Sequence, residues 1–192
     1  MELGGHAPVL IFDDCDLEKT LDMVVPQKFR NAGQVCVSPT RFYVQSGIYD
    51  AFIKGFAERT QKVKVGNGLE ADTRMGPLAN SRRPDAIDAL VQDAKAKGAR
   101  IMAGGERGDG GFFFQPTLLA DVPNEANIMN DEPFGPVAVT RAFDTFEEAI
   151  EQANRLPFGL AAFAFTENGR RANMIGDLVE SGMVGINTFA IS

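Results

Sequence analysis

Short apolar runs alternate along the chain with longer segments whose apolar residues recur every three or four positions. The short runs predict buried β-strands, at residues 9–12, 41–45, 100–103, 112–114, 117–119, 137–143, 160–165 and 182–187. The longer segments predict amphipathic helices, at residues 16–33, 48–63, 84–97, 146–156 and 167–179. Helices of this length between strands form right-handed crossovers between parallel strands. The expected fold class is therefore α/β, a largely parallel open sheet with flanking helices, in one domain.

Composition removes several classes of partner. The 192 residues carry 19 basic and 26 acidic side chains, a net charge of −7, so binding to nucleic acid or an anionic membrane is not expected. Two basic pairs, Arg82-Arg83 and Arg170-Arg171, are interpreted as solvated helix surface. No apolar run approaches the roughly 20 residues of a membrane-spanning helix. The first residues also lack a signal-peptide pattern, which favours a cytoplasmic location. With 15 phenylalanines and no tryptophan, the core should be rich in phenylalanine.

Two cysteines and one histidine are too few for a disulfide framework or a structural zinc site, so we expect no metal. Cys36 follows the predicted helix 16–33, which Pro26 should kink or interrupt and Gly33 should end. Cys36 is therefore expected on an accessible loop, whose amides could support an oxyanion. Cys15 lies among aspartates that oppose thiolate formation, so a small buried side chain is the simpler interpretation there.

Two further segments carry a carboxylate, one close to two glycines and the other directly before a proline. Glu2 precedes the pair Gly4-Gly5, and taken alone it would be a surface residue at the end of a strand. Glu132 and Phe134 lie in residues 131–136, where two prolines and a glycine restrict the backbone. Taken alone, this second segment would be a turn leading into the strand at 137–143.

Together these segments resemble the aldehyde dehydrogenase superfamily. Residues 1–8 are similar to its glutamate signature, and residues 29–36 to its cysteine signature, with 34 positions from Glu2 to Cys36. Residues 132–136 are similar to its cofactor-ribose motif. Residues 75–78 and 185–187 are similar to further family segments, so the resemblance covers essentially the whole chain. His6 departs from the pattern, since asparagine or lysine is commoner at that place.

The resemblance implies oxidation of an aldehyde through a thiol. Cys36 would attack the aldehyde to give a thiohemiacetal, and loss of hydride to NAD or NADP would leave a thioester. Glu2 would act as general base for the water that hydrolyses this thioester. Glu132 would bind the hydroxyls of the nicotinamide ribose through its two oxygens, and Phe134 would pack beside the nicotinamide.

The resemblance also suggests what a complete member would add. Such enzymes have an upstream dinucleotide-binding domain, with an asparagine that completes the oxyanion hole, and a C-terminal tail that reaches a neighbouring subunit. We therefore expect residues 1–192 to be a single catalytic-domain fragment of a homo-oligomeric parent, inactive by itself. The glycines at 66 and 68 are not a dinucleotide fingerprint, because no helix opens at Gly68 and no βαβ unit follows.

Arg30 bears on the substrate, because it lies six residues before Cys36. An arginine in the last turn of a helix often points into water, where it complements the helix dipole. The run around Arg30 also resembles the succinate-semialdehyde dehydrogenase branch, where an arginine at this place grips the distal carboxylate. Ser38 could donate a hydroxyl to the same anion. The candidate substrates are then acid semialdehydes: succinate, glutarate or α-ketoglutarate semialdehyde.

Three other functions compete with this interpretation. The chain could be a non-catalytic folded fragment that only packs against partner domains or subunits. It could be a Cys–His thiol hydrolase, which would need His6 as its base because no other histidine exists. A CoA-acylating aldehyde dehydrogenase is disfavoured, since those members generally lack the glutamate that Glu2 matches.

Overall fold

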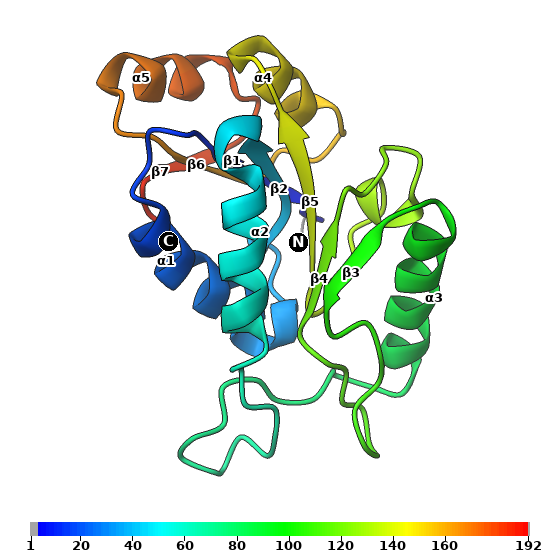
Figure 1. Ribbon diagram of the computed structural model, residues 1–192. Coiled ribbons are helices and arrows are strands. Elements are labelled where there is room, and N and C mark those ends of the chain that lie inside the picture. Colours follow the sequence, from blue (N-terminus) through cyan, green and yellow to red (C-terminus); the bar gives the residue numbers. More distant parts are fainter. Residues whose placement is uncertain (1–3, 192) are drawn as a thin grey trace.

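The computed structural model describes residues 4–191, and its strands form one seven-stranded sheet in the order β3-β4-β5-β2-β1-β6-β7 (Figure 1). The strands are β1 (Ala7–Ile11), β2 (Pro39–Gln45), β3 (Arg100–Ala103), β4 (Thr117–Ala120), β5 (Val137–Phe143), β6 (Ala161–Phe165) and β7 (Met183–Ile186). All neighbouring strands are parallel except β3 and β4, which are antiparallel. The predicted α/β class with a largely parallel sheet is confirmed.

Five α-helices and two 3-10 segments connect these strands. They are α1 (Leu17–Phe29), η1 (Arg30–Gly33), α2 (Ser46–Thr60), α3 (Arg82–Ala96), η2 (Asn127–Met129), α4 (Phe146–Asn154) and α5 (Gly169–Leu178). Helices α1 and α2 pack against each other and cover the central strand β2, while α3 packs against η2 and α4 against β1 (Figure 1). No helix within residues 4–191 is long and apolar enough to cross a membrane.

Two predicted elements differ from the structure. Helix α1 is not interrupted at Pro26 but continues through it to Phe29. Proline lacks one backbone N–H, yet the carbonyl of Pro26 still accepts the N–H of Arg30, which closes the last turn. Residues 112–114 form no strand, and Phe114 makes only an isolated bridge to Arg107.

The core is rich in phenylalanine, as the composition predicted. All five residues of β1 and all five of β6 are buried, because helices or loops cover both faces of these strands. The largest fully buried aromatic side chains are Phe12, Phe29, Phe42, Tyr43, Phe52, Phe56, Phe114, Phe143, Phe163 and Phe165.

The amino ends of adjacent strands bring the candidate segments to one edge of the sheet. Strand β2 lies between β1 and β5, with Ala7 opposite Pro39 and Arg41 opposite Val139. Gly5, Cys36 and Glu132 each precede one of these three parallel strands by a few residues. Because parallel strands all begin at the same edge, the three segments converge there.

Candidate active site

The chain reverses sharply between α1 and Cys36. Asn31, Ala32 and Gly33 are consecutive left-handed residues, with φ values of 51°, 55° and 69°. Glycine adopts this conformation at no cost and asparagine tolerates it, whereas alanine is strained there. The loop then closes with the amide of Ser38 donating to the carbonyl of Val35 at 2.9 Å. Cys36 is consequently half-buried on a short loop that leads into β2, where the sequence placed it.

Two glycines allow the three signature segments to touch. A Cβ atom on Gly5 would overlap the carbonyl oxygen of Cys36, and one on Gly33 would overlap the carbonyl oxygen of Gly135. The amide of Gly5 also donates to Oε1 of Glu132 at 2.9 Å. The backbone of residues 4–5 therefore lies directly on the Cys36 loop and against the Glu132 carboxylate. Only glycine permits so close an approach at these two positions.

Within residues 4–191, one carboxylate oxygen of Glu132 accepts a hydrogen bond and the other has no hydrogen-bond partner. Its Oε1 accepts the Gly5 amide, whereas Oε2 lies 3.4 Å from where a Gly4 side chain would begin. The absence of a side chain at Gly4 thus leaves space beside Oε2. Phe134, two residues on, is half-buried and has a φ of +41°.

Arg83 holds the Phe134 turn from helix α3. Its Nη2 donates to the carbonyl of Phe134 at 3.2 Å and to the carbonyl of Pro133. Burial lowers the pKa of Arg83, while Glu132 opposes that effect. The interpretation of Arg83 as solvated helix surface is wrong, because Arg83 is half-buried and its guanidinium donates to two backbone carbonyls some 50 residues further along the chain.

The second basic pair needs the same correction. Arg171 forms an ion pair with Asp14 at 3.0 Å, and its guanidinium lies 4.4 Å from the ring centroid of Phe12. Only the neighbouring Arg170 is exposed, as the sequence suggested. Both corrected arginines bind groups that are distant in sequence, so helical periodicity could not reveal them.

Glu2 lies outside the described residues. The structure places its neighbours Gly4 and Gly5, but the predicted general base itself has no described position.

A cavity of about 350 Å³ lies beside the Cys36 loop. Its lining includes Arg30 and Ser38, the two predicted substrate residues, and Val35 and Val37, which flank Cys36 on either side. The side chain of Arg30 is exposed and makes no hydrogen bond or ion pair with the rest of residues 4–191. Phe189 also lines this cavity. The structure thus brings Arg30 and Ser38 together beside the thiol loop.

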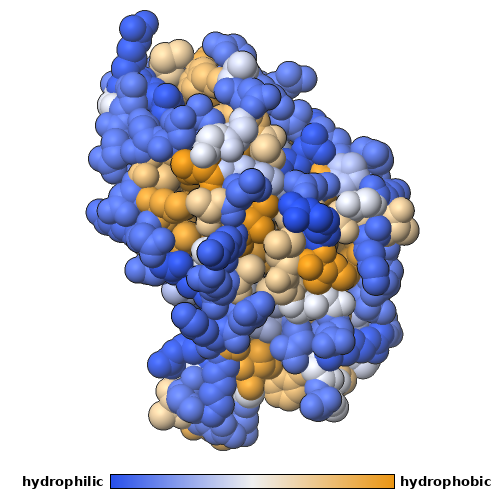
Figure 2. Space-filling view, in the orientation of Figure 1, coloured by the Kyte–Doolittle hydropathy of each residue, from blue (hydrophilic) through white to orange (hydrophobic). Residues whose placement is uncertain are grey.

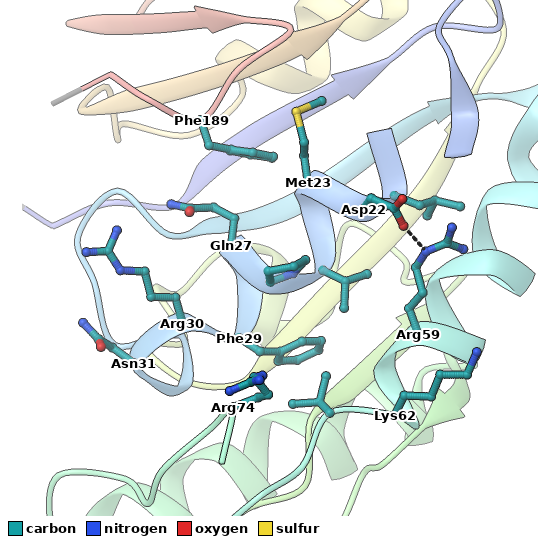
Figure 3. A pocket seen from close by; sticks show the side chains of 14 residues that line it. Asp22, Met23, Gln27, Phe29, Arg30, Asn31, Arg59, Lys62, Arg74 and Phe189 are labelled. Atoms are coloured by element: carbon teal, nitrogen blue, oxygen red, sulfur yellow. Dashed lines mark hydrogen bonds and ion pairs between the residues drawn. The ribbon is translucent and has the colours of Figure 1, made fainter. Parts of the chain in front are cut away.

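A larger cavity of about 810 Å³ adjoins it along α1 and shares Gln27, Arg30, Asn31 and Phe189 with it (Figure 3). Its lining is mainly apolar, and the Asp22–Arg59 ion pair stands at its side (Figure 3). Apolar residues are exposed among hydrophilic ones over the middle of the molecule (Figure 2). No residue next to Cys36 lines the larger cavity, so the smaller one is the candidate for substrate.

Lys28 is a site residue that the sequence interpretation missed. Its side chain is fully buried beneath the Cys36 loop, with Nζ 3.4 Å from Oγ of Ser38 and 3.2 Å from where a Gly33 side chain would begin. Burial lowers the pKa of Lys28 to about 7. The helical spacing from Leu21 through Val24 to Lys28 places it on the apolar face, and this signal could have revealed it.

His6 is also buried, and both ring nitrogens are engaged. Nδ1 lies 2.7 Å from Oγ1 of Thr40, and Nε2 lies 2.9 Å from the carbonyl oxygen of Ile128. Burial, reinforced by Arg41, lowers its pKa to about 3. A ring with neither nitrogen available cannot take a proton from Cys36, so the Cys–His hydrolase hypothesis loses its base.

The two thiols differ in their surroundings. Burial raises the pKa of Cys15, and the nearby Asp14 and Asp16 raise it further against a hydrogen bond from Thr20. The amides of Cys36 and Val37, by contrast, donate to no acceptor in the described part of the chain. Two unengaged amides beside a half-buried thiol are the donors that an oxyanion next to that thiol requires.

Comparison with known proteins identifies chains that are similar to this one. The chain matches the aldehyde dehydrogenase family over residues 1–192. It is 44% identical over 192 residues to a putative 4-(hydroxymethyl)benzenesulfonate dehydrogenase, TsaD2, of Comamonas testosteroni, a match that covers all of this chain and 40% of the relative. It is 42% identical over 193 residues to the NADP(+) succinate-semialdehyde dehydrogenase GabD of Escherichia coli, again covering all of this chain and 40% of the relative.

A solved structure agrees with the sequence matches. The crystal structure of succinate-semialdehyde dehydrogenase from Burkholderia pseudomallei superposes with a TM-score of 0.97 at 41% identity, over all of this chain and 40% of that one. The chain therefore spans about two fifths of the length of the relatives that it matches.

Proposed function

The chain belongs to the aldehyde dehydrogenase family, and we propose that residues 1–192 are the thiol-bearing catalytic domain of an enzyme that oxidises an aldehyde to a carboxylate. The observation that carries this proposal is the convergence of three segments. Gly5 lies on the carbonyl of Cys36 and donates to Glu132, and Gly33 lies on Gly135. Each contact joins two signature segments that are distant in sequence.

Cys36 is the proposed nucleophile. Its thiolate attacks the aldehyde carbon, and the negative charge that develops on the aldehyde oxygen is stabilised by the amides of Cys36 and Val37. These amides have no acceptor within residues 4–191, so they need not break a protein hydrogen bond to do so. Glu2 then takes a proton from the water that attacks the thioester.

Glu132 and Phe134 are the proposed cofactor residues. Oε2 of Glu132 is the oxygen left for a ribose hydroxyl, because Oε1 holds the Gly5 amide, and the bare backbone at Gly4 leaves space beside it. This arrangement fits a nicotinamide nucleotide. When bound, NAD or NADP would accept the hydride that converts the thiohemiacetal on Cys36 into a thioester. The ring of Phe134 would pack at the nicotinamide end.

An acid semialdehyde is the proposed substrate. Arg30, which has no hydrogen-bond or ion-pair partner within residues 4–191, lines the 350 Å³ cavity together with Ser38. A guanidinium binds a carboxylate or a sulfonate through paired donors. The names of two relatives include succinate semialdehyde and a benzenesulfonate, and both molecules carry an anionic group away from the reacting carbon. Succinate semialdehyde is the first candidate, with glutarate and α-ketoglutarate semialdehyde as alternatives.

The cytoplasmic location, the homo-oligomeric state and the dinucleotide-binding domain outside this chain stay predictions. We also predict that residues 1–192 alone bind NAD⁺ weakly or not at all.

Protection of the thiol against alkylation tests the proposal without a cofactor. Iodoacetamide should label Cys36 faster than Cys15, because burial and two aspartates raise the pKa of Cys15. Succinate semialdehyde should slow labelling of Cys36 by forming the thiohemiacetal, and leave Cys15 unchanged as the internal control. Peptide mapping after brief labelling measures both sites. Equal protection of the two cysteines, or none, would favour the non-catalytic fragment.

A further inference from the structure

The imidazole of His6 lies in the first signature segment and contacts residues next to the other two. His6 directly follows Gly5, which lies on the Cys36 carbonyl. Its Nδ1 contacts Thr40, four residues after Cys36, and its Nε2 contacts the carbonyl of Ile128, four residues before Glu132. The ring is 1% exposed, so it meets protein and not solvent.

The partners of the ring determine its tautomer. A carbonyl oxygen can only accept a hydrogen bond, so Nε2 must carry the proton that is donated to Ile128. In a neutral ring Nδ1 is then an acceptor, and the Thr40 hydroxyl donates its one proton to it over 2.7 Å. The Ala7 carbonyl, 3.2 Å from the same hydroxyl, is the longer and competing acceptor of that proton. The charged groups that act on the ring are Arg41, Lys28 and Arg155, all of which disfavour its protonation. The neutral ring with its proton on Nε2 satisfies both partners.

The surroundings of the ring are held independently. Nε of Arg41 donates to the carbonyl of His6 at 2.9 Å, which fixes the backbone on the β2 side. On the other side, Arg155 donates to the carbonyl of Met129 at 2.7 Å and to Oδ1 of Asn130 at 2.8 Å. The segment that ends at Glu132 is thus pinned next to the bond that His6 makes to Ile128. The ring joins Thr40 on the β2 side to Ile128 on the other side, through one acceptor and one donor nitrogen.

We propose that His6 is a positioning residue, whose neutral imidazole sets the placement of the Gly5 backbone relative to the Cys36 loop and to Glu132. The proposal rests on the proposed function for the roles of Cys36 and Glu132, but the geometry that it assigns to His6 stands on the contacts alone. The ring touches neither substrate nor cofactor. It acts through Gly5, whose amide holds the Glu132 carboxylate and whose Cα lies against Cys36.

Nitrogen-15 NMR on the unmodified chain provides the first test. His6 is the only histidine, so its ring nitrogens need no assignment. The proposal requires the tautomer with the proton on Nε2 at pH 7. A ring protonated on Nδ1, or one that exchanges rapidly between tautomers, would overturn it.

Amide hydrogen exchange in a variant pair provides the second test. His6→Asn keeps a polar group near Nδ1 but is too short to reach Ile128, whereas the amide of His6→Gln can reach that carbonyl. In His6→Asn the Gly5 amide should exchange at least about 10-fold faster, the size expected when a buried hydrogen bond weakens. Cys36 should be alkylated about threefold faster as its loop loosens, with Cys15 unchanged. In His6→Gln the exchange rate of Gly5 and the alkylation rate of Cys36 should both return most of the way to those of the unmodified chain.

Ile175→Ala is the matched control, because Ile175 is fully buried on α5 and makes none of these contacts. A general loss of stability in this variant should speed exchange of core amides together, without singling out Gly5. If His6→Asn behaves like Ile175→Ala, or leaves Gly5 and Cys36 unchanged, the positioning role is refuted. If His6→Asn does not fold, two measurements still test the positioning role. One is the tautomer of the unmodified ring, and the other is the comparison of Gly5 exchange and Cys36 alkylation between His6→Gln and the unmodified chain. If succinate semialdehyde does not protect Cys36 from alkylation but the His6 variants behave as expected, the proposed function is refuted and the positioning role of His6 is not.

Discussion

Replacing Lys28 by methionine should stabilise the protein at neutral pH, and by less as the pH rises. Lys28 is fully buried, and its one hydrogen bond within residues 4–191 is the 3.4 Å contact with Ser38. Burial lowers its pKa from 10.5 to about 7. At about 1.36 kcal/mol per pH unit, the buried lysine costs about 4 kcal/mol at pH 7 relative to an exposed one, since half of the folded chains have already lost the proton there. Methionine has a similar length and shape and carries no charge to desolvate.

The pH dependence follows from the two pKa values of Lys28. Between pH 7 and pH 10.5 the unfolded chain binds a proton at Lys28 and the folded chain does not, so the free energy of unfolding rises with pH in this window. Lys28→Met lacks this dependence. Its advantage over the unmodified chain should therefore shrink by about 3 kcal/mol between pH 7 and pH 9.5.

Urea unfolding followed by circular dichroism at pH 7, 8 and 9.5 measures this difference. Lys19→Met is the matched control, because Lys19 lies on the same helix and is exposed, so its effect should be small. If the difference between Lys28→Met and the unmodified chain does not vary with pH, the reasoning is refuted. That result would mean that Lys28 is charged in the folded protein.

Three further predictions follow from the site. Below pH 6.5 the unfolded chain protonates His6 but the folded chain does not until about pH 3, so the free energy of unfolding should decrease by up to about 5 kcal/mol as the pH is lowered through this window. Urea unfolding at a series of acidic pH values should show this decrease, and His6→Gln should lack it. Gly5→Ala should destabilise the fold by about 1–3 kcal/mol, because its Cβ would overlap the carbonyl of Cys36. The urea midpoint should fall, and succinate semialdehyde should protect Cys36 less well from alkylation. An unchanged midpoint would show that the Cys36 loop can move away from the new Cβ without loss of stability. Arg30→Ala in the complete enzyme should lower kcat/KM for succinate semialdehyde by roughly 10- to 150-fold, from about 1.5–3 kcal/mol for the charged pair, and leave butyraldehyde oxidation almost unchanged; equal losses on both substrates would assign Arg30 to the fold.

The sequence predicts well whatever depends on local pattern. The strand at 137–143 has the predicted bounds. Cys36 lies on a loop because the apolar periodicity ends before it. The edge of the sheet where the site lies could also be predicted, since Gly5 and Cys36 each precede an apolar strand and parallel strands begin at a common edge.

What the sequence does not predict depends on partners far along the chain. Arg83 has the same local signature as the exposed Arg82, and only the fold brings it to the Pro133 carbonyl. The left-handed conformation of Ala32 has no local signal, because alanine favours the right-handed region. His6 looks like a departure from a motif until Thr40 and Ile128 are seen beside its ring.

The central claim is that Cys36 forms the covalent intermediate, and mass spectrometry of the complete enzyme tests it most directly. Glu2→Gln keeps the size of the general base but cannot take a proton from water, so the thioester should accumulate. Quenching this variant during oxidation of succinate semialdehyde should show a burst of reduced cofactor and a succinyl adduct on the peptide that carries Cys36. A burst with the adduct on any other residue, or oxidation at the normal rate by Cys36→Ala, would contradict the claim.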